Sequence, residues 1–327
     1  MKNILSALQN TTHPKGNTYP GEQSAVLTRL PAPKNETPLI VSCPHAGIII
    51  PQNVLPNLKI TPQETLARGD RYTDWLTVNA PNSEIGAKHI ISTIAPSIVN
   101  VARARTSLNP ENIRGDLTTL KAIVDQYTQN GAGQGVIALK TLYGSHPIYR
   151  EGQEPDEAEI TERLTAFYDP FHKRLETEVK NTAGKHGYAL IFDAHSCPSI
   201  GPPCDIDAGQ ERPDIIFSNA DGESVNQNLM NELTKLARQH GFTNTKINHP
   251  YTGGFITRQY GTNGEKGKQY GTEALQVEFN RKTMGIDERT MKIIDTAKFK
   301  SVQTFTNAML LHLSAYASNQ TVQTIDA

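Results

Sequence analysis

Short apolar runs alternate with amphipathic segments along most of the chain. Tyr188–Phe192 is an apolar run with the length and bulk of a strand that is buried on both faces, and Leu39–Ser42 has the same design. In Ala274–Asn280 apolar and polar residues alternate, so one face of this strand is apolar and the other, which carries Glu278, is polar. These segments predict the inner strands of a sheet.

Between these strands, apolar residues recur at spacings of three and four, which is typical of helices with one buried face. The longest such stripe lies in Pro155–Lys185, where Pro170 is expected to kink the helix or divide it. Further helices are expected over Ser224–His240 and Ile293–Leu313. Strands that alternate with helices over the whole length indicate one α/β layer structure.

The chain of 327 residues has no internal repeat and no linker that would divide it. We expect one α/β domain over residues 38–313, which would carry any catalytic site. Residues 1–37 are expected to form an irregular lead-in with one edge strand near Ala25–Leu30, and residues 314–327 a C-terminal tail.

Composition and charge exclude several classes of partner. Lys and Arg number 32 and Asp and Glu 33, so no excess of positive charge favours nucleic acid. No apolar run approaches the roughly 18 residues of a membrane-spanning helix, and Met1–Pro20 has no apolar core of a secretory signal. Three cysteines are too few for a disulfide framework, which favours a reducing compartment. We therefore expect a cytoplasmic protein that binds neither nucleic acid nor a membrane.

Two histidines follow the two buried-type strands. His45 comes after Leu39–Ser42, and His195 comes after Tyr188–Phe192 with Asp193 between them. In an α/β sheet, sites are built at the carboxyl ends of the strands. For a single segment of this kind, the ordinary alternative to a functional site is an Asp that caps the strand end and a His that is hydrogen-bonded in the loop. Two segments of one design, far apart in the chain, indicate a single site assembled from both halves.

Two histidines and one carboxylate, with a fourth position open, are a known catalytic zinc set. The carboxylate is expected from Asp70 or Asp74, which would share a face of a helix that begins at the capping box Thr61–Glu64. We expect the other acid to be solvated. One catalytic Zn²⁺, or another divalent metal in its place, would activate water and polarise a carbonyl.

A metal-dependent hydrolase also needs a base and positive charge near the reacting carbonyl. Glu278, on the polar face of its strand, could take the proton. Arg103, Arg105 and Arg258 are candidates for stabilising an oxyanion or binding a substrate carboxylate. For Arg103 and Arg105, which would point the same way on an extended segment, surface salt bridges are the alternative.

Several short motifs follow one another between about residue 38 and about residue 310: Pro44–Gly47, Thr73–Trp75, Arg103–Asn109, Tyr168–His172, Asp193–Ser196, Arg212–Asp214, Gly253–Arg258 and Leu275–Glu278. Together, and in this order, they resemble the N-formylglutamate amidohydrolase (N-formylglutamate deformylase) family. The resemblance implies a three-layer α/β fold of the phosphorylase/hydrolase type with a mixed central sheet, as in the zinc carboxypeptidases. It also implies hydrolysis of N-formyl-L-glutamate to formate and L-glutamate, a step of histidine degradation.

The resemblance also implies roles for individual residues. Asp70 is the alternative third metal ligand. The implied roles are metal binding for His45, Asp74 and His195, general base for Glu278, and orientation of the substrate carboxylates and the oxyanion for Arg103, Asn109 and Arg258.

The chain departs from the family pattern at one position. Where the family commonly reads Asp-Leu-Asn-Arg, this chain reads Ser107-Leu108-Asn109-Pro110. A positive charge that could bind a substrate carboxylate is therefore missing, unless Arg105 or Arg114 replaces it.

Three functions are compatible with these residues. The leading one is a zinc amidohydrolase with an N-acyl amino acid substrate, N-formyl-L-glutamate first. The second is a related hydrolase of another N-acyl amino acid or a peptide-like amide. The third is a non-catalytic metal-binding relative, which would have no use for a base at Glu278.

Overall fold

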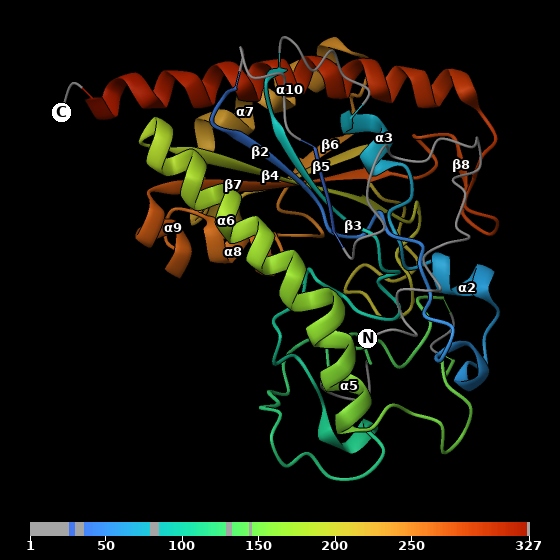
Figure 1. Cartoon of the computed structure of the whole chain (residues 1–327). Helices are drawn as coiled ribbons and strands as arrows, with labels where there is room; N and C mark the ends of the chain where they lie inside the picture. The colour runs from blue at the N-terminus through green and yellow to red at the C-terminus, as the bar shows by residue number, and fades with distance from the viewer. Residues whose placement is uncertain (1–25, 30–35, 79–84, 129–132, 144–145, 326–327) are drawn as a thin grey trace.

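The apolar runs of the sequence form the inner strands of a mixed sheet (Figure 1). The structure, a computed structural model, describes residues 26–29, 36–78, 85–128, 133–143 and 146–325. The strands of the sheet are β1 Val26–Arg29, β2 Leu39–Cys43, β3 Lys88–Ser92, β4 Ala189–Cys197, β5 Ile215–Ser218, β6 Thr245–Ile247 and β7 Thr272–Asn280. They lie in the order β1-β3-β2-β4-β7-β5-β6.

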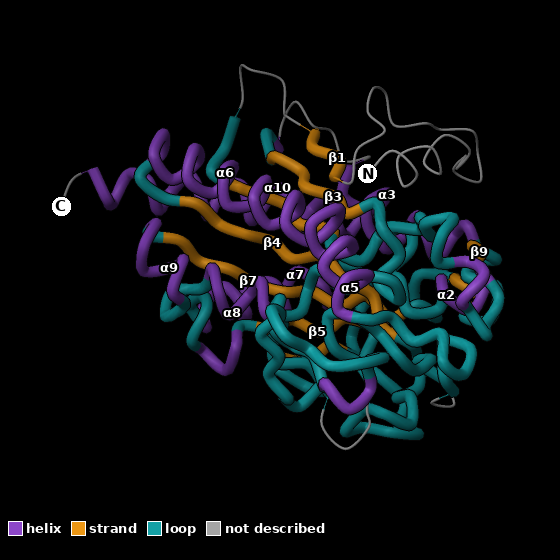
Figure 2. Tube along the Cα trace, turned by 60° about the horizontal axis from the view of Figure 1, so that its bottom comes forward, coloured by secondary structure: helices purple, strands orange, loops and turns teal. Residues whose placement is uncertain are grey.

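The four central strands β3, β2, β4 and β7 run parallel to one another. At the sides, β1 is antiparallel to β3, β5 is antiparallel to β7, and β6 is parallel to β5. The carboxyl ends of the central strands therefore meet at one edge, and long loops gather at that end of the sheet (Figure 2). A separate two-stranded sheet pairs β8 Ile286–Asp287 with β9 Lys292–Ile293.

Helices cover both faces of the sheet, which confirms the three-layer α/β fold (Figure 1). The α-helices are α2 Pro62–Leu66, α3 Thr73–Val78, α5 Glu157–Arg163, α6 Asp169–His186, α7 Gln227–Gln239, α8 Phe255–Tyr260, α9 Glu265–Tyr270 and α10 Thr296–Ile325. Short 3₁₀ turns occur at η2 Leu55–Asn57, η3 Pro110–Asn112 and η6 Ala220–Gly222. One apolar cluster joins α3, α7 and α10 to one face, and a second joins α6 and α8 to the other. No helix in the described ranges combines the length and the apolarity needed to cross a membrane.

The amphipathic segment around Pro170 is divided, as its sequence predicts. A π-helical turn, η5 Leu164–Tyr168, joins α5 to α6, and Pro170 lies in the first turn of α6. The expected stripe is buried throughout, from Ile160 to Val179. His172 in this stretch bonds the Val101 carbonyl oxygen at 2.8 Å through Nε2, which is a structural role.

The single helix expected beyond Thr61 was a wrong prediction. The capping box at Thr61 is present, but α2 ends at Leu66 and α3 begins only at Thr73. Tyr72 adopts a φ of 73°, which lies outside the right-handed α-helical region. Asp70 therefore lies in a turn, where its backbone N–H donates to the His45 carbonyl oxygen at 2.8 Å.

The C-terminal helix is longer than its sequence predicted. We expected it to end at Leu313, but α10 continues to Ile325 through a segment without Gly or Pro. Tertiary contacts hold this extension, because Ser314 Oγ donates to the Ile85 carbonyl oxygen at 2.9 Å and Ala317 is fully buried. At the other end of the chain, β1 forms the expected edge strand, whereas 1–25 and 30–35 lie outside the described residues.

The buried acid of α3 generates a prediction about stability. Burial raises the pKa of Asp74 to about 7, so the folded chain keeps this proton at pH values where the unfolded chain has released it. The stabilisation of the folded chain by protonated Asp74 is present at acidic pH and is lost as the pH rises from about 4 to about 7. Relative to Asp74→Asn, the wild type should lose about 2 kcal/mol of unfolding free energy between pH 5 and pH 8.

Urea unfolding of both proteins at the two pH values, with a chelator present throughout, measures this difference. Parallel pH profiles of wild type and variant would show that Asp74 ionises normally in the folded chain.

Candidate metal centre and active site

Three potential metal ligands converge at the carboxyl end of the central strands. His45 lies in the turn that follows β2, His195 lies near the end of β4, and Asp70 lies between α2 and α3. The Nδ1 atoms of both histidines are 3.1 Å from the same atom, Asp70 Oδ2. One ligand atom from each residue lies within 4.8 Å of the others. The structure thus brings the two strand-end histidines together, as the sequence predicted.

The opposite ring nitrogens of the two histidines are held by fixed acceptors. His45 Nε2 lies 2.7 Å from Asn100 Oδ1, which also accepts the backbone N–H of Ala102. His195 Nε2 lies 3.0 Å from Asp193 Oδ2. Because these oxygens accept, each neutral imidazole is protonated on Nε2 and directs the lone pair of Nδ1 towards Asp70. Histidines that bind metals are oriented by the same kind of outer partner.

Electrostatics at this cluster favour a cation. Burial lowers the pKa of His45. At His195, burial also disfavours the charged ring, but Asp193 and Asp70 outweigh burial and raise the pKa well above its usual value. Although burial opposes ionisation, the histidines hold the pKa of Asp70 well below its usual range. Three converging electron-pair donors with an ionised carboxylate are a set that a divalent cation fits.

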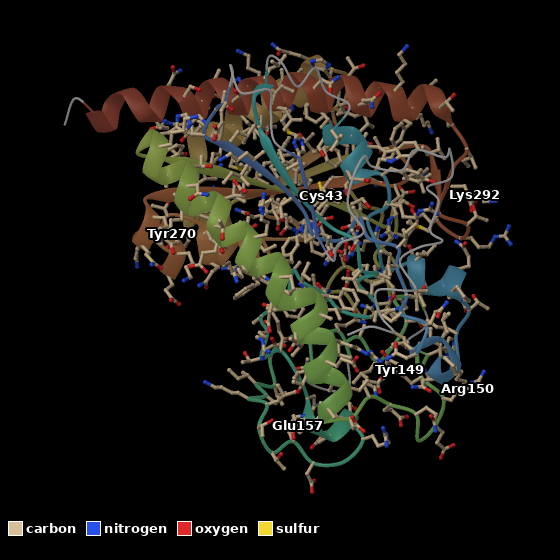
Figure 3. All side chains as sticks on the ribbon, viewed as in Figure 1. Cys43, Tyr149, Arg150, Glu157, Tyr270 and Lys292 are labelled. Carbon is tan, nitrogen blue, oxygen red and sulfur yellow. The ribbon has the colours of Figure 1, made fainter. Side chains whose placement is uncertain are left out.

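The acid in this cluster is Asp70, the alternative from the sequence, and not Asp74. Asp74 lies inside α3 and is buried, but it is not part of the converging group. The expected shared helix face left the choice between the two acids open, and the family resemblance implied Asp74; the structure breaks that helix between them. Cys43, at the end of β2, is buried with its sulfur 3.6 Å from Thr77 Oγ1 and packs as a small core residue (Figure 3).

Glu278 lies beside the cluster on the neighbouring strand. The parallel register of β4 and β7 pairs Glu278 with His195, and the polar face predicted for β7 faces the site. Gln276 Nε2 donates to Glu278 Oε1 at 2.9 Å, while Gln276 Oε1 accepts the Gly254 backbone N–H at 2.7 Å. Burial raises the pKa of Glu278 to about 7, although His195 opposes the shift. The carboxyl group is thus held in place and suited to proton transfer near neutral pH.

Arg281 is a site residue that sequence reasoning missed. Its Nη2 lies 2.9 Å from the Gly69 carbonyl oxygen and 3.4 Å from Asp70 Oδ1, and its side chain is 1% exposed. Ser196 Oγ donates to the same Asp70 oxygen at 3.0 Å. Arg281 directly follows β7, so the strand-end rule that identified the histidines could also have found it.

The cluster opens into a cavity of about 560 Å³, which is within the usual range for small-molecule sites. His45, Asp70, His195 and Glu278 line it, and loop residues complete the wall. Among the arginines predicted for substrate, Arg103 lines this cavity.

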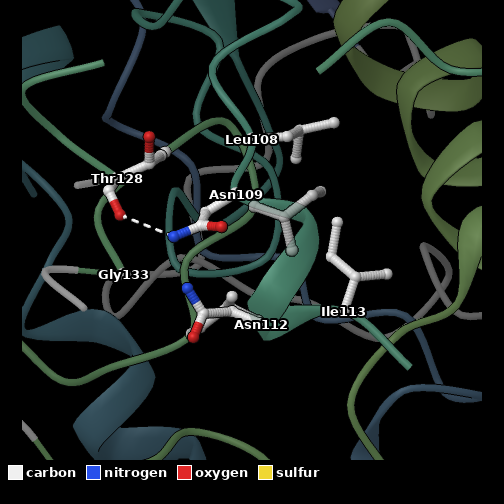
Figure 4. A pocket seen from close by; sticks show the side chains of 9 residues that line it. Leu108, Asn109, Asn112, Ile113, Thr128 and Gly133 are labelled. Carbon is white, nitrogen blue, oxygen red and sulfur yellow. Dashed lines mark hydrogen bonds between the residues drawn. The ribbon is translucent and has the colours of Figure 1, made fainter. Parts of the chain in front are cut away.

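The other two predicted substrate residues lie elsewhere. Asn109 is buried at the start of η3, in a separate small cavity, where its Nδ2 donates to the Thr128 carbonyl oxygen at 3.2 Å (Figure 4). The segment after Gly254 forms the helix α8, and Arg258 on it is exposed. Arg258 donates to Thr252 Oγ1 at 2.8 Å and does not line the cavity.

The matched family model is N-formylglutamate amidohydrolase, over residues 37–284. An N-formylglutamate deformylase from Pseudomonas aeruginosa is 27% identical over 231 residues, which cover 70% of this chain and 76% of the relative. One from Pseudomonas putida is 26% identical over 226 residues, 68% of this chain and 74% of the relative. The fold matches the crystal structure of an N-formylglutamate amidohydrolase from Ralstonia eutropha with a TM-score of 0.77 at 20% identity, covering 91% of this chain and 99% of that one. The chain therefore belongs to the N-formylglutamate amidohydrolase family and is a hydrolase that acts on an amide bond.

Proposed function

We propose that the chain is a zinc-dependent deformylase that hydrolyses N-formyl-L-glutamate to formate and L-glutamate. The observation that carries the proposal is the convergence of His45, Asp70 and His195 beside Glu278 in one cavity. Family membership supports the amide as the bond that is broken.

His45, Asp70 and His195 would hold the metal, with Asn100 and Asp193 orienting the two rings. Two nitrogens and one carboxylate oxygen suit Zn²⁺ with a position left for water or substrate. When bound, zinc would supply a Lewis acid that lowers the pKa of water and polarises the formyl carbonyl.

Glu278 is the proposed general base and acid. It takes a proton from the water that attacks the formyl carbon, and it passes that proton to the amide nitrogen as the C–N bond breaks. Formate leaves with the water oxygen, and glutamate leaves as the amine. A carboxyl pKa near 7 allows both transfers, and the bond from Gln276 keeps the group in position.

Metal-loaded protein should release formate from N-formyl-L-glutamate, and a chelator should stop the release. N-acetyl-L-glutamate is the comparison, since a formyl-specific site discriminates against the added methyl group. The measurement is formate production under both conditions. Equal rates on the formyl and acetyl substrates would favour the broader N-acyl amino acid hydrolase instead.

Metal binding should depend on Asp70 and not on Asp74. His195→Ala and Asp70→Asn each remove a ligand and should lower zinc affinity at least tenfold, whereas Asp74→Asn should keep stoichiometric zinc. Calorimetric zinc titration of the purified variants measures this without reference to turnover. Full zinc retention in Asp70→Asn, or loss in Asp74→Asn, would reverse the assignment.

Replacement of the proposed base should remove turnover and leave the metal site intact. Glu278→Gln keeps the shape of the side chain but cannot accept the proton, so kcat should fall by about 10²–10⁴-fold. Glu273→Gln, in the same strand and bonded to Tyr188 and Tyr316, is the matched control and should retain kcat. The proposed mechanism fails if zinc-loaded Glu278→Gln stays within tenfold of wild type.

A further inference from the structure

The cavity that contains the cluster is lined by three arginines with different neighbours. Arg281 is paired with Asp70. Arg68 and Arg103 also line the cavity, yet neither has a carboxylate within 4.0 Å among the described residues. Two cations of this wall therefore lack a charge partner in the described part of the chain.

The acids on the cavity wall are committed elsewhere. Asp205 and Asp207 both accept from Arg212, at 2.6 Å and 2.7 Å. Asp70 belongs to the metal cluster. None of these carboxylates, nor Glu278, lies within 4.0 Å of the guanidinium nitrogens of Arg68 or Arg103.

Arg68 and Arg103 converge on one residue, Gln134. Arg68 Nη1 donates to Gln134 Oε1 and its Nη2 donates to the Lys140 carbonyl oxygen. Arg103 Nε donates to the Gln134 carbonyl oxygen at 3.4 Å, and its guanidinium lies 3.6 Å from the centre of the Tyr127 ring. Neutral acceptors and an aromatic face thus hold both guanidinium groups beside each other.

The positive charges of these two guanidinium groups are not balanced by a paired carboxylate among the described residues. Both arginines carry a guanidinium charge, and the Nε of Arg68 is buried without a hydrogen-bond partner among the described residues. An anion between the two groups would compensate both charges and occupy unused donors. Guanidinium geometry suits a carboxylate.

At Pro110 the chain lacks the arginine that the family commonly has, and another arginine takes up a place on the cavity wall. The two arginines that could have replaced the missing charge are engaged outside the cavity: Arg105 pairs with Asp169, and Arg114 pairs with Asp156. Arg68 is the arginine that the fold places on the cavity wall next to Arg103.

We propose that Arg68 and Arg103 form a cationic subsite that binds one carboxylate of the substrate, with Arg68 as a specificity-determining residue. The inference rests on the proposed function, since N-formyl-L-glutamate carries two carboxylates. It narrows the substrate class to formyl amino acids with a carboxylate at that position.

The test compares Arg68→Met on three substrates: N-formyl-L-glutamate, its γ-amide N-formyl-L-glutamine, and its α-amide N-formyl-L-isoglutamine. The variant should lose about tenfold to a hundredfold in kcat/KM on the dicarboxylate, as expected for charged hydrogen bonds. On the amide that lacks the bound carboxylate, kcat/KM should change less than threefold. Arg68→Lys should retain part of the preference, and Arg114→Met should behave as wild type on all three. An equal loss on every substrate, or no loss, would overturn the proposal.

A binding measurement separates this inference from the proposed function. Glutarate, a dicarboxylate without an amide, should bind the zinc-loaded wild type, and Arg68→Met should weaken its affinity at least tenfold by calorimetry. Arg68-dependent glutarate binding without formate release would leave the subsite standing and refute the deformylase. Formate release with unchanged glutarate binding in Arg68→Met would refute the subsite alone.

Discussion

The site depends on the convergence of three electron-pair donors on one point. Asp70 Oδ2 lies 3.1 Å from the Nδ1 atoms of both His45 and His195, so a shared proton or a cation is needed to balance their electron pairs. The fold holds them there through the backbone, since the Asp70 N–H donates to the His45 carbonyl oxygen. A Cβ at Gly69 would lie 3.3 Å from that same oxygen, so the turn also needs a small residue. Arg281, the residue after β7, compensates part of the negative charge by donating to Asp70 Oδ1 without entering the ligand set.

Strand register connects the candidate metal cluster to Glu278, the proposed base. β4 and β7 are buried along almost their whole length, so apolar residues on both faces fix how they pair. In that register Glu278 lies opposite His195, and Gln276 lies opposite Asp193. A slip by one residue would turn Glu278 to the apolar face. The separation between the His45–Asp70–His195 cluster and Glu278 is thus set by core packing, and the bonds of Gln276 only orient the Glu278 side chain.

The sequence predicts the parts of the site that lie on strands. Periodicity identifies the strands, the strand-end rule then selects His45 and His195, and the polar face of β7 selects Glu278. The same reasoning could not identify the third ligand of the cluster. The choice between Asp70 and Asp74 depends on a break between two helices, where Tyr72 has a positive φ. The sequence pattern does not single out Arg68 as a site residue either. Its partners Gln134 and Lys140 lie in loops, and only tertiary structure brings them together.

The distribution of charge along the cavity favours one binding orientation of the proposed substrate. Asp70, Asp193 and Glu278 gather negative charge around the two histidines, which favours a metal cation and the carbonyl that it polarises. Arg68 and Arg103 gather positive charge on another part of the same wall. A substrate with an amide at one end and a carboxylate at the other satisfies both parts in one orientation, and the reverse orientation leaves a buried carboxylate beside Glu278. Like-charge repulsion of this kind discriminates as strongly as attraction, so the acidic cluster itself helps to select the binding mode.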